Sequence, residues 1–266
     1  MTSKRYLIIE LVMVCILGIL CFSIYEKRTG TVADKGVWKE AKASEADKGV
    51  WNEAAGANTE ESRQKVCYLT FDDGPSKNSE KILDILDEYE AKATFFLIGE
   101  ELSEEKKPIL KRMVESGHAI GLHSNVHDLN ELYGSVDICV QDFEAEYVTL
   151  KEEYGIDTKL FRFPGGSACR YMGGQRKQFV AAMQEKGYRC YDWNVSGEDS
   201  YGNPTAWSVQ ENVFSNFFDY SKPIILLHDA NGAGATVEAL PGILEKIKAE
   251  GYTFGTLENE EEYVYR

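Results

Sequence analysis

Residues 66–76 of the chain are VCYLTFDDGPS, an apolar run that stops at two aspartates and a glycine–proline pair. The run from Val66 to Phe71 has the length and the aromatic content of a buried strand. Gly74 and Pro75 are typical of a turn that ends a strand. We therefore expect Asp72 and Asp73 at the carboxyl end of this strand.

Similar apolar runs recur along the chain and alternate with stretches of helical periodicity. Strands are predicted at residues 66–71, 93–98, 119–122, 160–163, 188–193, 223–228 and 252–257. Helices are predicted at residues 79–90, 104–116, 136–154, 174–186, 209–220 and 235–250. Four of them are followed by a glycine that can end the helix, at positions 117, 155, 187 and 251.

This alternation of strands and helices implies parallel strands joined by right-handed crossovers. The sequence therefore predicts an α/β fold, either a (β/α) barrel or a doubly wound sheet. In both architectures the functional residues gather at the carboxyl ends of the strands.

The composition excludes several functional classes. The 266 residues include 44 acidic and 29 basic side chains, for a formal net charge of -15. Such a chain has no basic field to attract a phosphate backbone, so we expect no nucleic-acid partner. Six cysteines are too few for a scaffold built on disulfides, and none belongs to a C-x-x-C pair.

Two segments precede the predicted strands. Residues 6–25 form an apolar run that, as a helix, is about as long as a bilayer core is thick. We expect residues 1–25 to form a cytoplasmic tip and an uncleaved, single-pass transmembrane anchor. A cleaved signal peptide, with a small-residue site at Thr31–Ala33, is the alternative.

Residues 26–64 are polar and contain an internal repeat. The motif ADKGVW occurs at residues 33–38 and again at residues 46–51. Two short copies cannot bury a core of their own, so we expect a linker or stalk. Trp38 and Trp51 are expected to be incidental linker residues, with sugar binding as the alternative.

Three predicted strands end in residues that bind metals or transfer protons. In chain order they are Asp72 and Asp73, His123 and His127, and His228 with Asp229. Two histidines at i and i+4 with one carboxylate form a metal site that leaves coordination positions open. Zinc or a related ion there polarises a carbonyl group and lowers the pKa of bound water to about 7. A second carboxylate beside the ligands can act as general base.

Five motifs resemble those of the polysaccharide deacetylase family, the NodB-homology carbohydrate esterases of family 4. They are TFDDGPS at residues 70–76, HSNVH at 123–127, FRFPGGS at 161–167, DWNVSGED at 192–199 and LLH at 226–228. The resemblance implies that residues 65–266 form a distorted (β/α) barrel of about seven parallel strands. It also implies a metal-dependent deacetylase activity.

The resemblance implies a role for each matching residue of the metal site. Asp73, His123 and His127 would bind a divalent ion. Zinc is the first candidate, and cobalt or another divalent ion is the alternative. Asp72 would be the base that deprotonates water. Arg162 would pair with Asp72 and keep it ionised.

The fourth and fifth motifs would supply the general acid and its partner. His228 would protonate the departing amine, since the pKa of histidine lies close to neutrality. Asp199 is the first candidate to orient His228. Asp192 is the second, because strand alternation can point either side chain into the site.

Three further residues would contact the substrate. The backbone N–H of Gly165 would help to stabilise the oxyanion. Trp193 and Leu226 would line the pocket for the sugar and the acetyl methyl group, with packing in the core as the alternative for both.

We therefore expect an enzyme that removes N-acetyl groups from an extracellular polysaccharide, in first place the N-acetylglucosamine of peptidoglycan or a chitin-like polymer. An O-acetyl esterase acting on xylan or another acetylated glycan is the first alternative, and a non-catalytic glycan-binding surface protein is the second. The catalytic domain is expected outside the cell membrane, or secreted if the N-terminal segment is cleaved. His118 is expected to be structural. We expect the cysteines of this domain to be free, with Cys169–Cys190 as the preferred pairing if a disulfide forms.

Overall fold

The computed structural model describes residues 65–265. The predicted transmembrane anchor at residues 1–25 and the predicted stalk at residues 26–64 lie outside this range. Among the described residues, no helix combines the length and the apolar character needed to cross a bilayer.

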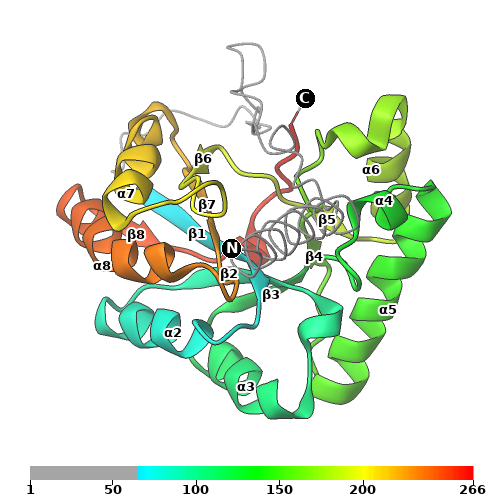
Figure 1. The fold of residues 1–266 in the computed structure, drawn as a ribbon, viewed down its shortest axis with the longest axis horizontal. Helices are drawn as coiled ribbons and strands as arrows, with labels where there is room; N and C mark the ends of the chain where they lie inside the picture. Colours follow the sequence, from blue (N-terminus) through cyan, green and yellow to red (C-terminus); the bar gives the residue numbers. More distant parts are fainter. Residues whose placement is uncertain (1–64, 266) are drawn as a thin grey trace, which may run out of the picture. The chain divides into compact units, whose positions relative to one another are not determined.

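Eight strands form the central sheet (Figure 1). They are β1 (Lys65–Gly74), β2 (Ala93–Leu97), β3 (Ala119–Leu122), β4 (Leu160–Phe161), β5 (Arg189–Cys190), β6 (Val195–Ser196), β7 (Ile224–His228) and β8 (Tyr252–Phe254). Their order is β5-β4-β3-β2-β1-β7-β6, and β8 pairs with the first residues of β1. All of these strand pairs are parallel, as the alternating sequence pattern predicts.

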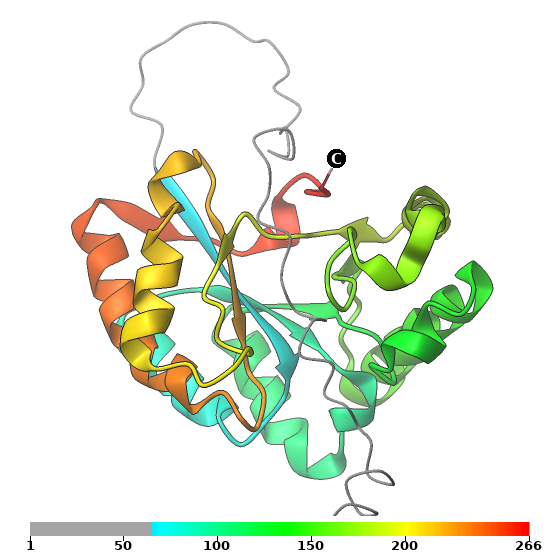
Figure 2. The same ribbon diagram turned by 45° about the horizontal axis from the view of Figure 1, so that its top comes forward.

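The strands form an open barrel surrounded by helices (Figure 2). Strands β5 and β6 stand at the two ends of the sheet order, and no pairing between them closes the barrel within residues 65–265. The fold is thus the distorted α/β barrel that the sequence predicts, with one more strand than expected.

The prediction of a single strand at residues 188–193 is wrong. Strand β5 ends at Cys190, and a separate strand, β6, starts at Val195. Next to the end of β5, the backbone hydrogen-bonds to the C-terminal segment. The Tyr263 N–H donates to the Cys190 carbonyl at 3.1 Å, and the Asp192 N–H donates to the Tyr263 carbonyl at 2.7 Å. The Tyr191 N–H still donates to the Phe161 carbonyl of β4 at 2.9 Å, and Tyr191 forms a parallel bridge with Tyr263. The regular strand therefore ends earlier than the apolar pattern suggests.

Within residues 65–265, seven α-helices accompany the strands. They are α2 (Ser79–Glu88), α3 (Lys107–Glu115), α4 (Leu129–Leu132), α5 (Val136–Tyr154), α6 (Arg176–Glu185), α7 (Ala206–Phe214) and α8 (Gly234–Ala249). The predicted bounds of α5 are confirmed. Ser135 precedes the helix, and its hydroxyl accepts the N–H of Ile138. Gly155 follows the last residue of the helix and has a φ of 70°, a conformation that glycine adopts without strain. The short helix α4 was not predicted, and 3-10 turns replace parts of three other predicted helices.

The buried side chains separate into two clusters by strand alternation. On β1, Leu69 and Phe71 pack with the helices, whereas Tyr68 lies in a second cluster that contains no α-helical residue. This second cluster is the barrel interior. Thr70 and Asp72 continue the side of β1 that starts at Tyr68, and both are buried. The strand period therefore directs Asp72 into the barrel.

Candidate active site

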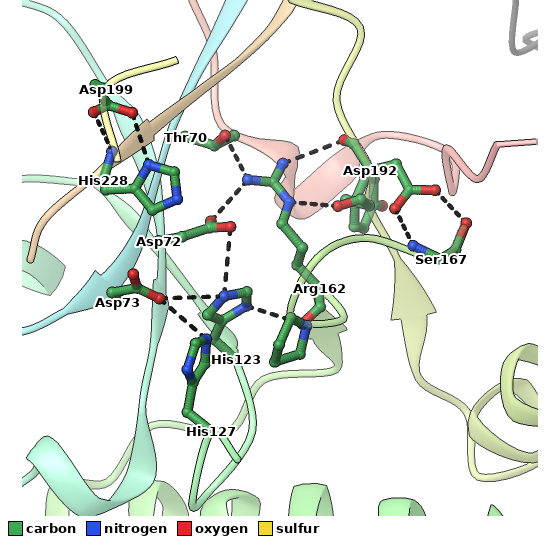
Figure 3. A network of polar contacts seen from close by, with 12 residues as sticks. Thr70, Asp72, Asp73, His123, His127, Arg162, Ser167, Asp192, Asp199 and His228 are labelled. Carbon is green, nitrogen blue, oxygen red and sulfur yellow. Dashed lines mark hydrogen bonds and ion pairs between the residues drawn. The ribbon is translucent and has the colours of Figure 1, made fainter. Parts of the chain in front are cut away.

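The predicted metal ligands and acid–base residues come together at the carboxyl ends of the strands (Figure 3). Asp72 and Asp73 lie at the end of β1, and His123 directly follows β3. Arg162 directly follows β4, and His228 is the last residue of β7. The parallel register places Asp72 opposite His228.

A cluster of three residues has the geometry of a metal site. The Asp73 Oδ1 oxygen lies 3.4 Å from His123 Nε2 and 3.3 Å from His127 Nε2. One donor atom from each residue can be chosen so that all three lie within 4.8 Å of one another. The structure thus brings together the three residues that the sequence predicts as ligands.

The protonation of His123 suits a metal ligand. Its Nδ1 lies 3.0 Å from the carbonyl oxygen of Arg162, and a carbonyl can only accept, so Nδ1 carries the proton and Nε2 keeps its lone pair. Burial, followed by the neighbouring His127, lowers the pKa of His123 to about 3, which keeps the ring neutral. Two imidazoles and a carboxylate with this tautomer fit a divalent ion of the zinc type.

Asp72 lies beside this cluster but bonds to a different partner. Its Oδ1 accepts a hydrogen bond from Arg162 Nη1 at 2.8 Å, and its Oδ2 lies 3.6 Å from His123 Nε2. Burial raises the pKa of Asp72 above its ordinary value, and the charge and hydrogen bond of Arg162 oppose that rise. Arg162 therefore favours ionised Asp72, as expected, although burial has the larger effect on the pKa.

Arg162 is fully buried in the barrel interior and forms four hydrogen bonds. Besides Asp72, its guanidinium donates to the Thr70 hydroxyl at 2.7 Å and to the carbonyl oxygens of Tyr191 at 2.6 Å and Asp192 at 3.2 Å. The bonds to Thr70, Tyr191 and Asp192 fix the position of the guanidinium group. The guanidinium group in turn fixes the position of the Asp72 carboxylate.

Asp199, not Asp192, contacts His228. Asp199 Oδ1 lies 2.7 Å from His228 Nδ1, and its Oδ2 accepts the His228 backbone N–H at 2.8 Å and the Thr236 hydroxyl at 2.5 Å. Burial lowers the pKa of His228, but the charge and hydrogen bond of Asp199, together with the charges of Asp73 and Asp72, raise it to about 10. His228 is thus a proton donor near neutral pH.

Asp192 has a different set of partners. Its carboxylate accepts the Ser167 N–H at 2.8 Å, the Ser167 hydroxyl at 2.5 Å and the Tyr265 N–H at 2.8 Å. It therefore joins the FRFPGGS loop to the C-terminal segment. The sequence alternative that pairs Asp192 with His228 is wrong.

The three predicted substrate contacts differ in exposure. Gly165 is exposed, with a φ of 75°, and follows Pro164, whose carbonyl oxygen accepts the Tyr133 hydroxyl at 2.7 Å. Trp193 and Leu226 are only 8% and 2% exposed and belong to the cluster inside the barrel. The two buried side chains therefore pack in the core, which is the alternative given for both.

Sequence reasoning missed one buried acid near the site, Glu146, and gave no role to Asp229, which it named beside His228. Glu146 of α5 is fully buried and accepts the backbone N–H of His123. Asp229 is fully buried and accepts the hydroxyl groups of Ser76, at 2.7 Å, and Ser79. The burial of Glu146 could have been found from the sequence, because this residue falls on the apolar side of a predicted helix. The sequence signal for Asp229 is its position directly after His228.

The remaining predictions concern His118 and the cysteines. His118 is buried, its Nδ1 accepts the Ala93 N–H at 3.2 Å, and it takes no part in the metal cluster. Burial lowers its pKa to about 4, so it is neutral and structural, as expected. The cysteines at positions 67, 139, 169 and 190 are all free, and the pairing of Cys169 with Cys190 does not form.

Comparisons with known proteins agree with this geometry. The model of the polysaccharide deacetylase family matches residues 59–191. A peptidoglycan-N-acetylglucosamine deacetylase of Bacillus cereus is 32% identical, over 98% of this chain and 96% of that protein. A bifunctional xylanase/deacetylase of Pseudobutyrivibrio xylanivorans is 37% identical, over 76% of this chain and 31% of that protein. The solved catalytic domain of a peptidoglycan N-acetylglucosamine deacetylase from Eubacterium rectale has a TM-score of 0.70 and 32% identity, over 80% of this chain and 97% of that domain.

Proposed function

Because the chain belongs to the polysaccharide deacetylase family, we propose that it is a metal-dependent hydrolase that removes N-acetyl groups from the N-acetylglucosamine of peptidoglycan. One observation carries this proposal: a possible metal site, a carboxylate and an imidazolium converge at one end of the barrel. Amide hydrolysis needs all three, because the carbonyl must be polarised, the water deprotonated and the amine protonated.

Each protein group has a distinct step in this reaction. Asp73, His123 and His127 would hold the divalent ion, which polarises the acetyl carbonyl and makes water a better nucleophile near neutral pH. Asp72, fixed by Arg162, accepts the proton of the attacking water.

The tetrahedral intermediate needs a hydrogen-bond donor for its oxyanion, and its collapse needs a proton donor for the departing nitrogen. The Gly165 N–H would donate to the oxyanion. His228 is bonded to Asp199 through Nδ1, so the proton for the departing nitrogen leaves from Nε2. The products are acetate and a free amine on the sugar.

Removal of O-acetyl groups from xylan is the second candidate function. The relative from Pseudobutyrivibrio xylanivorans, which is named a xylanase/deacetylase, favours it. The same groups can attack an ester carbonyl, and an alcohol departs with less help from an acid than an amine does. A non-catalytic glycan-binding role has no comparable support, because the acid, the base and the possible ligands are all in place.

Acetate release distinguishes these functions. The purified protein is incubated with peptidoglycan, N-acetylated chitooligosaccharides and O-acetylated xylan, with and without a chelator. We expect acetate from the first two, abolished by chelation and restored by zinc. Acetate from xylan alone would favour the esterase, and no acetate from any glycan would refute both enzyme functions.

We further propose that residues 1–25 anchor the enzyme in the cell membrane with the catalytic domain outside. The apolar run at residues 6–25 supports this, and peptidoglycan lies outside the membrane. Protease added to intact, wall-stripped cells should cut within residues 26–64 and release the domain. Protection of the domain until the membrane is permeabilised would refute the extracellular location.

A further inference from the structure

The histidine loop, residues 123–127, has an unusual backbone. Ser124 and His127 have φ angles of 78° and 59°, in the left-handed region that residues with a side chain seldom occupy. Such a conformation persists only where surrounding contacts hold it in place. Because this loop carries two of the three possible metal ligands, whatever holds it also sets the geometry of the metal site.

One contact comes from Glu146 in the middle of α5. The backbone N–H of His123 donates to the Leu97 carbonyl of β2 at 2.8 Å, and the two carboxylate oxygens of Glu146 lie further away, at 3.3 and 3.1 Å from the same nitrogen. The backbone of Ser124 also hydrogen-bonds to the same carboxylate. Glu146 thus holds the first two residues of the loop.

A second contact comes from Asp142, one helical turn earlier on α5. Its Oδ1 accepts the N–H of Asn125 at 2.8 Å, and its Oδ2 accepts the N–H of Val126 at 3.1 Å. The last N–H of the loop, that of His127, donates to the Ser124 hydroxyl at 2.9 Å. All five backbone N–H groups of the histidine loop therefore have an acceptor. The two acids accept from Ser124, Asn125 and Val126, and Glu146 shares the N–H of His123 with the Leu97 carbonyl.

The position of Glu146 is not explained by helix packing. It lies on the buried side of α5 in line with Cys139, Phe143 and Leu150, where an apolar side chain is expected. A carboxyl group at such a position costs free energy unless hydrogen bonds compensate for the lost water. Asp142, four residues earlier, lies on the same side of the helix. The common feature of the two acids is that both face the histidine loop.

We propose that Asp142 and Glu146 are positioning residues that hold His123 and His127 toward Asp73 and thereby set the metal affinity of the site. The inference rests on the proposed metal-dependent function. The two acids act through the backbone of the loop. Residues that orient metal ligands typically change metal affinity by about 10–100-fold when they are replaced.

The test uses two variants and one matched control in the full-length chain. Asp142→Asn keeps one acceptor but turns an amide NH2 toward a backbone N–H. Glu146→Met keeps a similar volume, suits the apolar side of α5 and removes both acceptors. Glu152→Gln removes a charge from an exposed position of the same helix.

Zinc affinity of the metal-free proteins is measured by competition with a chelating dye, and their thermal unfolding is measured in parallel. We expect zinc to bind about 10–100-fold more weakly to Asp142→Asn and Glu146→Met, with no change in the control. Metal-free Glu146→Met should stay folded, because the removal of a costly buried carboxyl offsets part of the cost of the Ser124 N–H that loses its acceptor. A residue that served only the fold would lower the unfolding temperature and leave the zinc affinity of the folded protein unchanged.

Two results would overturn the inference. One is zinc affinity equal to that of the wild type in both variants. The other is loss of the folded state in the metal-free variants, which would assign the acids to the fold alone. The zinc titration needs no substrate, so its outcome is independent of acetate release: a wild-type protein that binds zinc and releases no acetate would refute the proposed function and leave this inference standing.

Discussion

Replacement of Asp199 by asparagine should change the protonation of His228 more than any other property of the site. Asp199 contacts both the ring and the backbone of His228, at 2.7 and 2.8 Å. Asparagine has nearly the same shape and keeps one acceptor, but it removes the negative charge. The buried imidazolium of His228 then loses the negative charge that stabilises it most.

The size of the effect follows from the pKa of His228. That pKa is raised from 6.5 to about 10, and at 1.36 kcal/mol for each tenfold change this corresponds to about 5 kcal/mol in favour of the imidazolium. Burial opposes the shift, whereas Asp199, Asp73 and Asp72 produce it. Without the charge of Asp199, we expect the pKa of His228 to fall toward its ordinary value of 6.5.

Histidine side-chain NMR on the metal-free protein measures this directly. The chain contains only four histidines, and burial lowers the pKa of two of them, His118 and His123, to about 4 and about 3. Metal-free protein is required because a divalent ion would offset the negative charge of Asp73. Asp192→Asn is the control, since that carboxylate bonds to Ser167 instead. A His228 pKa near 6.5 in the wild type, or an unchanged one in Asp199→Asn, would refute the reasoning.

The same shift makes the stability of the metal-free protein depend on pH. Because the pKa of His228 is higher in the folded protein than in the unfolded chain, protonation favours the folded state. This contribution is complete below about pH 6.5 and is lost as the pH rises toward about 10. The free energy of unfolding should therefore fall over this interval, and less steeply in Asp199→Asn than in the wild type. Urea unfolding at several pH values measures the two slopes.

Three other predictions concern the rest of the site. His127→Ala should leave a folded domain with little bound metal and little turnover, measured by metal analysis and acetate release, and tight stoichiometric metal in this variant would contradict the site. Asp72→Asn should keep the metal while turnover falls by about 10²–10⁴, and metal loss here but not in Asp73→Asn would show that the two roles are reversed. Arg162→Met leaves a buried carboxylate without its cation, so urea unfolding should show a loss of about 3–5 kcal/mol, partly recovered when Asp72→Asn is added. This partial recovery of the free energy of unfolding is the diagnostic result. A destabilisation caused only by lost packing would remain in the double variant.

The main chemistry of the site could be predicted from the sequence because it depends on local patterns. The two-residue period of β1 fixes the side to which Asp72 points, and parallel strands bring their carboxyl ends to one edge. The i, i+4 spacing of His123 and His127 then supplies both imidazoles from a single loop. These relationships need no knowledge of distant contacts.

The resemblance put Asp199 first as the partner of His228, and this is confirmed. The strand pattern alone could not exclude Asp192, because the partner depends on a register between distant segments. Asp192 and Asp199 both lie close to a short strand, and strand alternation alone permits either. The pairing of Ser196 with Leu226 places the chain after β6 beside the end of β7, and this brings Asp199 to His228. A strand of two residues is too short for its alternation of apolar and polar residues to predict that pairing.

Glu146 shows a different limit of sequence reasoning. A glutamate in a helix rich in charged residues is normally assigned to the surface, and its own residue type supports that assignment. Only the spacing of Cys139, Phe143 and Leu150 indicates that position 146 is buried. Its acceptor role depends on the backbone of the histidine loop, whose left-handed residues have no clear sequence signature.

The four hydrogen bonds of Arg162 make this side chain a link across the open barrel, from β1 inside the strand order to the segment that follows β5 at one end. It joins Thr70 and Asp72 of β1 to the carbonyl groups of Tyr191 and Asp192, just beyond β5. Natural selection for a folded protein alone would therefore preserve this arginine, even in a descendant that had lost its enzymatic activity. Its presence in a distant homologue is consequently poor evidence that the homologue is an active enzyme; the pair formed by Asp199 and His228 at the rim is the better marker.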